Sequence, residues 1–356
     1  MADSNTETVR LNPNISGGFA INAAVIGGGS FGTAMAVLLA RNGHKVKMLV
    51  REENVKESIN ANHRNPLYMK QYTLPETIVA YDDNNVKDMF EGVQLIVHAI
   101  PVQFSSEYLA GLKEFIPAEV PVVSISKGIK TDTYELMCEI LPKVLPGGKE
   151  QPILFLSGPS FAEEIIEDQP TAVVLASTFK MAAKKVQVWM SNPLFRIYTS
   201  TDVIGVNLAG ALKNVIAIAA GMLEGMGFGR NTQAGLITRG NAEITRLGVA
   251  MGAKPETMAG LAGIGDLVLT CYGSLSRNRT VGQKLALGVP LDTIIKQMKS
   301  VAEGVYTTSA AVELAKRHGV EDLPIIEGVA SILKGQSTPL ETVMMMMIYR
   351  PFSDEF

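Results

Sequence analysis

The feature that most constrains the fold is a glycine-rich loop set between an apolar run and a helical pattern. The apolar run AINAAVI, at 20–26, ends in the six residues GGGSFG, at 27–32. Behind the loop, apolar residues recur at helical spacing to Asn42, Gly43 stops the helix, and KVKMLV at 45–50 has the composition of a strand. Strand, loop, helix and strand in this order predict a βαβ unit.

The loop matches the pattern G-x-G-x-x-G, which in this setting predicts a dinucleotide-binding turn. Gly27 permits the tight turn, Gly29 lets the backbone approach a pyrophosphate, and Gly32 lets helix and strand pack closely. The helix N-terminus then faces the phosphates. The alternative is an ordinary glycine-rich turn.

Further apolar runs are continuous rather than alternating, which is typical of strands buried on both faces of a parallel sheet. They are QLIVHAIP (94–101), PVVSISKG (121–128), PILFLSGPS (152–160) and TAVVLAS (171–177). Ligands of an open α/β sheet bind beyond the carboxyl ends of its strands, so the residues at these ends are binding candidates. They include Pro101, Lys127, Gly158 and Ser160.

After about residue 200 the strand-like runs stop and segments of helical period follow. The expected fold class is α/β, with a Rossmann-type, doubly wound, mainly parallel sheet followed by an all-helical C-terminal domain. We expect a flexible N-terminal tail at 1–20, a dinucleotide-binding domain at 21–200 and a helical substrate-binding and catalytic domain at 201–350. The methionine-rich end TPLETVMMMMIYR, at 338–350, is expected to pack into the core as a helix.

Charge and composition exclude several classes of protein. A formal net charge of -3 lacks the basic footprint of a nucleic-acid binder. The two cysteines, Cys138 and Cys271, supply neither a disulfide framework nor metal-ligand spacing, and we expect no metal. The first twenty residues carry acidic and polar residues in place of the apolar core of a signal peptide.

Lys213 is the most unusual charged residue, because it lies in the middle of the apolar segment 203–222. This segment has roughly the 20 residues that span a bilayer, but a charge at mid-span is costly, so we expect a buried helix and no membrane span. Helical spacing aligns Lys213 with a stripe of mostly small residues that would let another group approach. Burial lowers the pKa of a lysine and suits it to general acid/base catalysis. The alternative is a lysine that reaches from a helix contact to solvent.

Eight blocks make the chain similar to the NAD(P)-dependent glycerol-3-phosphate dehydrogenase family. In order they are GGGSFGTA, SKGIK, SGPSFAEE, DVIGVNLAGALKNVIAIAAG, NTQAGLITRG, GLAGIGDLVLTC, SRNRTVG and VAEGV, and they cover most of residues 23–310. The resemblance implies hydride transfer between a nicotinamide and C2 of a three-carbon phosphate, interconverting sn-glycerol 3-phosphate and dihydroxyacetone phosphate. Such a reaction feeds glycerophospholipid and glycerol metabolism. Asn207 and Phe31 depart from the residues that the family often has at these positions.

The resemblance also implies roles for particular residues. Lys213 would be the general acid/base, with Lys127 and Asp266 as further catalytic residues. Substrate contacts are expected for Lys127, Gly158, Ser160, Lys213, Asn214, Asp266, Thr270, Ser276, Arg277 and Asn278. Cofactor contacts are expected for Gly27, Gly29, Ser30, Phe31, Gly32, Arg51, Phe104, Lys127, Ala162, Arg277, Val301 and Glu303.

Elementary chemistry agrees with these roles. Arg277 with Asn278 can supply a cationic, hydrogen-bonding seat for a phosphate. As hydride reaches the carbonyl carbon, Lys213 can protonate the oxygen while Lys127 stabilises its charge. Asp266 can orient a lysine. Taken singly, Asp266 could instead be a turn or cap residue and Arg277 a surface charge.

The cofactor is expected to be NAD(P), with a lean toward NADP(H). The strand 45–50 ends at Arg51, where a guanidinium suits a 2′-phosphate, although Glu52 and Glu53 follow and a one-residue shift would favour NAD. His98 is expected to be a core residue, and Cys271 a small buried thiol rather than a nucleophile.

Two other functions remain open from the sequence. One is a hydroxy-acid dehydrogenase with a Rossmann domain and a helical domain, and the other is a non-catalytic nucleotide-sensing protein. The resemblance suggests a homodimer that binds a small phosphate substrate. A cytoplasmic location is the default, with a processed organellar form as the alternative.

Overall fold

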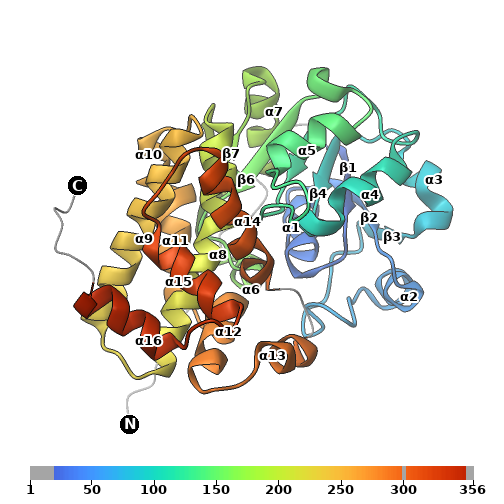
Figure 1. Ribbon diagram of the computed structural model, residues 1–356. Helices are drawn as coiled ribbons and strands as arrows, with labels where there is room; N and C mark the ends of the chain where they lie inside the picture. The colour runs from blue at the N-terminus through green and yellow to red at the C-terminus, as the bar shows by residue number, and fades with distance from the viewer. Residues whose placement is uncertain (1–19, 299–301, 350–356) are drawn as a thin grey trace, which may run out of the picture.

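The computed structural model describes residues 20–298 and 302–349 (Figure 1). Within them one sheet has eight strands: β1 (Asn22–Ile26), β2 (Lys45–Leu49), β3 (Ile78–Tyr81), β4 (Leu95–His98), β5 (Val122–Ser124), β6 (Ile153–Ser157), β7 (Thr171–Ala176) and β8 (Phe195–Ser200). Their order across the sheet is β3-β2-β1-β4-β5-β6-β7-β8. The chain thus reverses direction across the sheet between β1 and β4, and the glycine loop follows β1 at this point.

The mainly parallel sheet predicted from the continuous apolar runs is confirmed for β1 to β6. The run TAVVLAS was expected to be a parallel strand too, but β7 pairs antiparallel with β6. A continuous apolar pattern reports burial on both faces and not strand direction, which explains the error. Strands β3 and β8 were not predicted, because their outward-facing residues are exposed and the apolar runs are broken.

The helices of the sheet-bearing part cover both of its faces, where separate buried clusters form. They are α1 (Ser30–Arg41), α2 (Glu53–Asn62), α3 (Val86–Phe90), α4 (Val102–Leu112), α5 (Met137–Val144), α6 (Ala162–Ile166) and α7 (Lys180–Met190), with 3-10 turns η1 (Asp83–Asn85) and η2 (Gly148–Glu150). Helix α1 ends where predicted, and Gly43 follows it with a φ of +87°.

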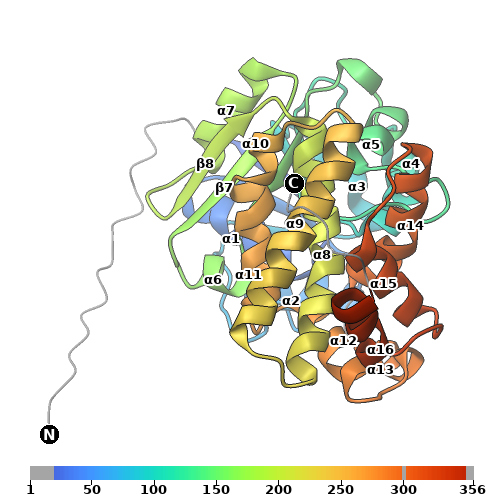
Figure 2. The same ribbon diagram turned by 60° about the vertical axis from the view of Figure 1, so that its left-hand side comes forward.

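Every element described after β8 is helical, which confirms the fold class. They are α8 (Val203–Gly225), α9 (Arg230–Ala250), α10 (Pro255–Met258), η3 (Leu261–Gly265), α11 (Asp266–Tyr272), α12 (Arg277–Ala286), α13 (Leu291–Gln297), α14 (Glu303–Arg317), α15 (Pro324–Leu333), α16 (Pro339–Met344) and η4 (Met345–Tyr349). Figure 2 shows α9 running beside α8, and α8 also contacts α11, α12 and α14.

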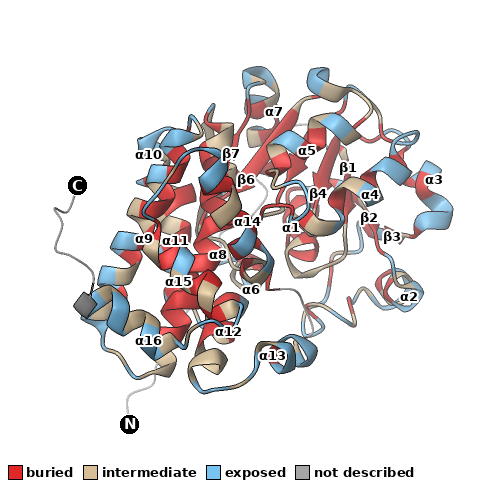
Figure 3. Ribbon diagram, in the orientation of Figure 1, coloured by how far each residue is buried: buried red, intermediate tan, exposed pale blue. Residues whose placement is uncertain are grey.

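Helix α8 is the segment that could be mistaken for a membrane span. It is long and apolar enough to cross a bilayer, but 78% of its most apolar window is buried inside the protein. The segments 255–272 and 277–286 are long and apolar enough to cross a bilayer only if they are counted together as one span that is bent by 49°. In Figure 3 α8 is mostly buried, whereas the outer helices carry exposed stretches. We therefore interpret α8 as the core helix of the helical part.

The prediction that the methionine-rich end packs into the core is wrong for most of its residues. Of the four methionines, Met344, Met345 and Met347 are exposed and Met346 packs against the helical core. Helix α16 begins with Thr338 and Glu341 capping each other, and none of its residues is buried. Apolar composition alone does not say whether a terminal helix finds a partner surface within its own chain.

Candidate active site

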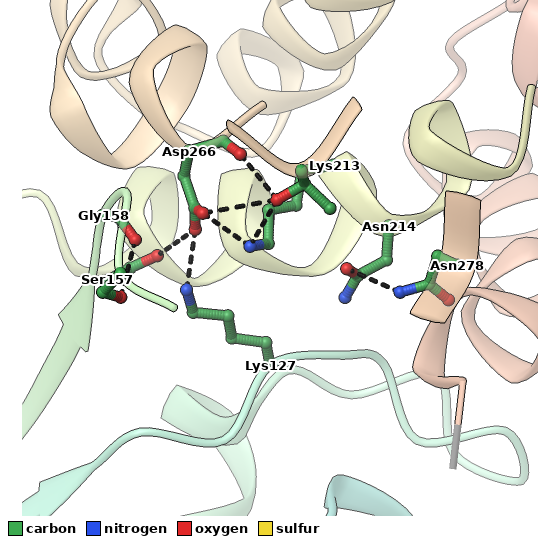
Figure 4. A network of polar contacts seen from close by, with 9 residues as sticks. Lys127, Ser157, Gly158, Lys213, Asn214, Asp266 and Asn278 are labelled. Carbon is green, nitrogen blue, oxygen red and sulfur yellow. Dashed lines mark hydrogen bonds and ion pairs between the residues drawn. The ribbon is translucent and has the colours of Figure 1, made fainter. Parts of the chain in front are cut away.

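A buried carboxylate between two lysines forms the centre of the candidate site (Figure 4). The Nζ atom of Lys213 donates to Asp266 Oδ1 at 2.6 Å and to Thr270 Oγ1 at 2.9 Å. The Nζ atom of Lys127 donates to the other carboxylate oxygen, Asp266 Oδ2, at 2.7 Å. Ser157 Oγ lies 3.5 Å from the same Oδ2 atom. The structure thus brings together all three residues that were expected to be catalytic, from three separate elements.

Small residues let these elements approach each other closely. Lys213 lies in the middle of α8, and Lys127 follows β5. A Cβ atom at Gly210, one turn before Lys213, would lie 3.0 Å from Ser157 Oγ and 3.4 Å from the side chain of Lys127. The glycine therefore makes room on α8 for the side chains that come from the sheet.

A glycine-dependent kink precedes Asp266. The π-helical turn η3 ends directly before Asp266, and Gly263 within it has a non-helical ψ of -105°. A Cβ atom at Gly263 would lie 2.2 Å from the carbonyl oxygen of Met258, far inside van der Waals contact. Single π-helical turns are often found at functional sites. Here the kink sets the start of α11, and with it the position of the Asp266 carboxylate.

Burial and charge set the protonation of this cluster. Burial lowers the pKa of Lys213 to about 8, although Asp266 opposes the shift and Lys127 adds to it. Burial alone would raise the pKa of Asp266, but the charges of Lys127 and Lys213 hold it below its usual value. Asp266 is therefore a carboxylate at neutral pH, and Lys213 can both hold and release a proton near that pH.

A second group of polar residues adjoins the first through neighbouring positions in the chain. Asn214, next to Lys213, accepts a hydrogen bond from Asn278 Nδ2 at 2.9 Å. The backbone N–H of Gly304 donates to Asn278 Oδ1, also at 2.9 Å. Figure 4 shows this pair beside the lysine cluster. These two hydrogen bonds link helices α8, α12 and α14 beside the lysine cluster.

Arg277 is an exposed residue at the start of α12, and its side chain makes no hydrogen bond or ion pair with the residues that the structure describes. Neighbouring atoms partly desolvate the guanidinium and so lower the pKa of Arg277, while Glu303, Glu163 and Tyr68 oppose this shift. Burial raises the pKa of Glu303 to about 7, with Arg277 opposing, and its Oε2 atom has no hydrogen-bond partner. An accessible guanidinium without a protein partner is suited to an anionic ligand such as a phosphate.

The loop after β6 was also expected to hold substrate. Gly158 has a φ of +149°, and a Cβ atom there would lie 2.9 Å from the Cα atom of Val173. Ser160 Oγ donates to the carbonyl oxygen of Gly158 at 2.9 Å, so its hydroxyl holds the turn. Ser276 likewise has a local contact, because its Oγ atom caps α12 by accepting from the Arg279 N–H at 3.3 Å.

The glycine loop has the close packing that its pattern predicts. Gly27 has a φ of +114°, and a Cβ atom there would lie 2.9 Å from the carbonyl oxygen of Ala99, which follows β4. A Cβ atom at Gly32 would lie 2.1 Å from the carbonyl oxygen of Gly27. At Gly29 a Cβ atom would meet nothing within 4 Å. Helix α1 has no side-chain cap at its N-terminus, so the loop is open on the side where a phosphate would bind.

The other expected cofactor residues lie on different elements. Arg51 is largely exposed and forms an ion pair with Glu52 at 2.8 Å. Phe104 is exposed on α4, and Ala162 begins α6. Phe31 packs against the core of the sheet, and Ser30 is the first residue of α1. Val301 lies outside the described residues.

His98 and Cys271 behave as expected for core residues. His98 is fully buried, and burial lowers its pKa to about 3, so the ring is neutral. Burial raises the pKa of the Cys271 thiol to about 12, which leaves no thiolate to act as a nucleophile. Among the described residues no group of three His, Cys, Asp or Glu side chains could hold a metal ion.

Several residues of the site were missed in the sequence. Ser157 stands directly before Gly158 at the end of β6, so its position at a strand end was an available signal. Gly263 carries no signal beyond being a glycine within a helical segment, whereas Gly210 belongs to the stripe of small residues that was predicted beside Lys213. Asn65 lies outside every sequence block, yet it is fully buried and bonded to the glycine loop.

Comparison with known proteins gives matches along almost the whole chain. Residues 22–183 match the model of the NAD-dependent glycerol-3-phosphate dehydrogenase N-terminus, and residues 202–344 match that of its C-terminus. The glycerol-3-phosphate dehydrogenase [NAD(P)+] of Citrifermentans bemidjiense is 45% identical over 324 residues, which cover 91% of this chain and 96% of that protein. The chloroplastic glycerol-3-phosphate dehydrogenase [NAD(+)] 2 of Arabidopsis thaliana is 46% identical over 325 residues, or 91% and 76% of the two chains.

A solved structure agrees with these sequence matches. The crystal structure of glycerol-3-phosphate dehydrogenase from Coxiella burnetii superposes with a TM-score of 0.87 at 36% identity. The superposition covers 93% of this chain and all of the other. The likeness therefore extends over both the sheet and the helical part.

Proposed function

The chain belongs to the NAD-dependent glycerol-3-phosphate dehydrogenase family and is an NAD(P)-dependent oxidoreductase of the CH–OH group of glycerol 3-phosphate, and from this premise we propose the roles of its own residues. The reaction interconverts sn-glycerol 3-phosphate and dihydroxyacetone phosphate, which is consistent with a place in lipid metabolism. Hydride transfer itself is the chemistry that bound NAD(P) supplies. The protein must bind, orient and exchange one proton with the substrate oxygen.

Lys213 is the proposed general acid and base. One observation supports this role above the others: two lysines share one buried carboxylate. Asp266 accepts hydrogen bonds from both Lys213 and Lys127. In reduction of the ketone, Lys213 gives its proton to the oxygen at C2, where negative charge develops as hydride arrives at the carbon. In oxidation, the neutral amine takes the hydroxyl proton back. A pKa of about 8 for Lys213 makes both forms available near neutral pH.

Lys127 and Asp266 are proposed to hold the charge around that proton transfer. The amine of Lys127, bonded to Asp266 Oδ2, stabilises the negative charge that develops on the substrate oxygen. Asp266 fixes the directions of both amines through its two oxygen atoms. Without this carboxylate the two ammonium groups would repel each other in a buried place.

The phosphate of the substrate is proposed to bind at Arg277. Its guanidinium has no ion-pair partner among the described residues, and a phosphate can accept two parallel hydrogen bonds from it. Asn278, which follows in the chain, bonds Asn214 and thereby links the phosphate seat to the helix that carries Lys213. Ser276, Thr270, Gly158 and Ser160 are proposed to complete the substrate site.

The dinucleotide is proposed to bind at the glycine loop 27–32 and the N-terminus of α1, with Phe31, Phe104, Lys127, Ala162, Arg277, Val301 and Glu303 as further contacts. Arg51 is proposed to recognise a 2′-phosphate and to favour NADP(H), because its exposed guanidinium lies directly beyond β2. The members of this family use NAD or NADP, and the preference within this chain is a proposal.

The organisation of the protein around this site is also proposed. Residues 21–200 would form the cofactor domain and 201–350 the substrate domain, after a tail at 1–20. A homodimer in the cytoplasm is the expected assembly, with a processed organellar form as the alternative, since some plant relatives are named chloroplastic. Sedimentation of the purified protein and fractionation of its host cell test these points.

The function is tested by following NAD(P)H absorbance with dihydroxyacetone phosphate as substrate. We expect oxidation of the reduced nucleotide that depends on this ketone, and slower or no oxidation with a 2-oxo acid in its place. Comparison of NADH and NADPH in the same assay tests the role of Arg51. Binding of nucleotide without turnover of any ketone would instead favour a nucleotide-sensing protein.

A further inference from the structure

Asn65 is a fully buried polar residue in the loop between α2 and β3, and it has no part in the roles proposed above. All the hydrogen-bonding groups of its side chain have partners. The amide nitrogen donates to the carbonyl oxygen of Gly28 at 2.8 Å and to Thr33 Oγ1 at 3.0 Å. The amide oxygen accepts from the backbone N–H groups of Leu67 at 3.2 Å and Tyr68 at 3.0 Å. A buried amide with four partners specifies one arrangement of the segments that it joins.

On one side Asn65 fixes a peptide group inside the glycine loop. Gly28 has no side chain to restrain it, and a Cβ atom there would lie 2.6 Å from Val50 Cγ1, so the loop is held between Val50 and Asn65. The carbonyl oxygen and the following N–H of a trans peptide point in opposite directions. Because the Gly28 carbonyl is bonded to Asn65, the N–H of Gly29 must point away from it. That N–H has no hydrogen-bond partner among the described residues, and it belongs to the glycine with open space around it.

On the other side Asn65 holds the start of the segment 65–69, which carries Tyr68. The pKa of Arg51 is raised mainly by Glu52, with smaller effects from Tyr68 and Tyr108. Partial desolvation lowers the pKa of Arg277, and Tyr68 is among the groups that oppose this. Tyr68 is thus among the groups whose charge affects both arginines.

We propose that Asn65 is a positioning residue for the dinucleotide, which holds the glycine loop with the Gly29 N–H aimed at the pyrophosphate and ties this loop to the segment 65–69. Binding then requires no rotation of the Gly28–Gly29 peptide, so the loop is preorganised for its anion. The inference rests on the proposed binding of the dinucleotide at residues 27–32. It concerns cofactor affinity and not the proton transfer at Lys213.

Hydrogen exchange of the wild-type protein tests the link without any substitution. Adding NADH or NADPH should slow exchange of amides both in 27–33 and in 65–69, because Asn65 joins the two segments. Slower exchange in 27–33 with no change in 65–69 would contradict the coupling and leave the proposed cofactor site standing. No change in either segment would remove the cofactor site from residues 27–32, and the inference with it.

Substitution tests the role itself. Asn65→Ala should raise the Kd of NADH and of NADPH by about tenfold or more and by equal factors, whereas kcat at saturating nucleotide should stay within about twofold. Asn65→Asp keeps the acceptor for the Leu67 and Tyr68 N–H groups but loses the donor to Gly28, so it should also bind weakly. Asn60→Ala is the matched control, because Asn60 bonds the N–H and carbonyl groups of Ala80 at 2.7 and 2.9 Å, away from the glycine loop.

The control should lose some thermal stability and keep the wild-type Kd. If folded Asn65→Ala binds both nucleotides as tightly as the control does, or if Asn65→Asp binds like wild type, Asn65 has only a structural role. A loss of kcat at saturating nucleotide with an unchanged Kd would also overturn the proposal. Should neither variant fold, the exchange experiment on the wild-type protein decides.

Discussion

Replacement of Lys213 by alanine and by arginine separates proton transfer from charge. Lys213→Ala removes the amine that lies 2.6 Å from Asp266 and leaves Lys127 as the cation on that carboxylate. Because one ion pair remains, the variant should fold and bind nucleotide. Lys213→Arg keeps a positive charge beside Asp266, but a guanidinium stays protonated and cannot return a proton.

The expected magnitude follows from the role of the amine. General acid/base catalysis contributes about 10²–10⁴-fold to a rate, which corresponds to roughly 2.7–5.4 kcal/mol of activation free energy. Both variants should lose kcat by a factor in this range in both reaction directions. The KM for nucleotide should change little, because Lys213 bonds Asp266 and Thr270 and makes no bond to the glycine loop.

The assay is steady-state turnover by NAD(P)H absorbance in both directions, with Kd for nucleotide from fluorescence and the thermal midpoint as controls for folding. The decisive comparison is the arginine variant at neutral pH. If Lys213→Arg keeps near-normal turnover, charge alone suffices, and Lys213 is an electrostatic anchor for Asp266. Lys127 would then be the better candidate for the proton donor.

Three further outcomes are expected. Lys213, with a pKa of about 8, should be protonated below this pH and neutral above it. The kcat for ketone reduction should therefore fall as pH rises through about 8, and the kcat for alcohol oxidation should fall as pH drops below it. A kcat that does not depend on pH in either direction would contradict the assignment. Arg277→Ala should weaken phosphate-substrate binding about tenfold to a hundredfold while nucleotide Kd changes little, and equal losses for both ligands would indicate shared positioning. Arg51→Asp should shift the ratio of kcat/KM for NADPH and NADH toward NADH, and an unchanged ratio would make Arg51 a surface charge.

Local parts of the fold were predictable from the sequence because their signals are local. The glycine loop, the first helix and its stop at Gly43 follow from steric rules that act within a few residues. The direction of β7 could not be predicted from the sequence, because this strand has the apolar pattern of a parallel strand but pairs antiparallel with β6. The exposure of Met345 and Met347 also did not follow, because helix burial depends on which surfaces meet in three dimensions.

The candidate site, too, could be predicted from the sequence only in part. The strand-end position singled out Lys127, the apolar surroundings singled out Lys213, and the resemblance added Asp266. Neither periodicity nor spacing could say that both lysines bond one carboxylate, since these residues come from segments far apart in the sequence. The kink at Gly263 that places Asp266 depends on contact with Met258 and is seen only in the structure. Asn65 was missed for the opposite reason, because an asparagine in a polar loop is usually an ordinary turn residue.

The geometry also indicates why Lys213, rather than its neighbour, should exchange the proton. The cluster holds two ammonium groups and one carboxylate, so it carries one net positive charge when both lysines are protonated. The side chain of Lys127 is 18% exposed and lies in the loop after β5, whereas that of Lys213 is 11% exposed and lies within a core helix. Desolvation opposes the charged form most strongly at the more deeply buried amine. Release of the proton from Lys213 leaves a neutral pair, Lys127 with Asp266, and thereby removes the excess buried charge at the moment the substrate oxygen gains its proton.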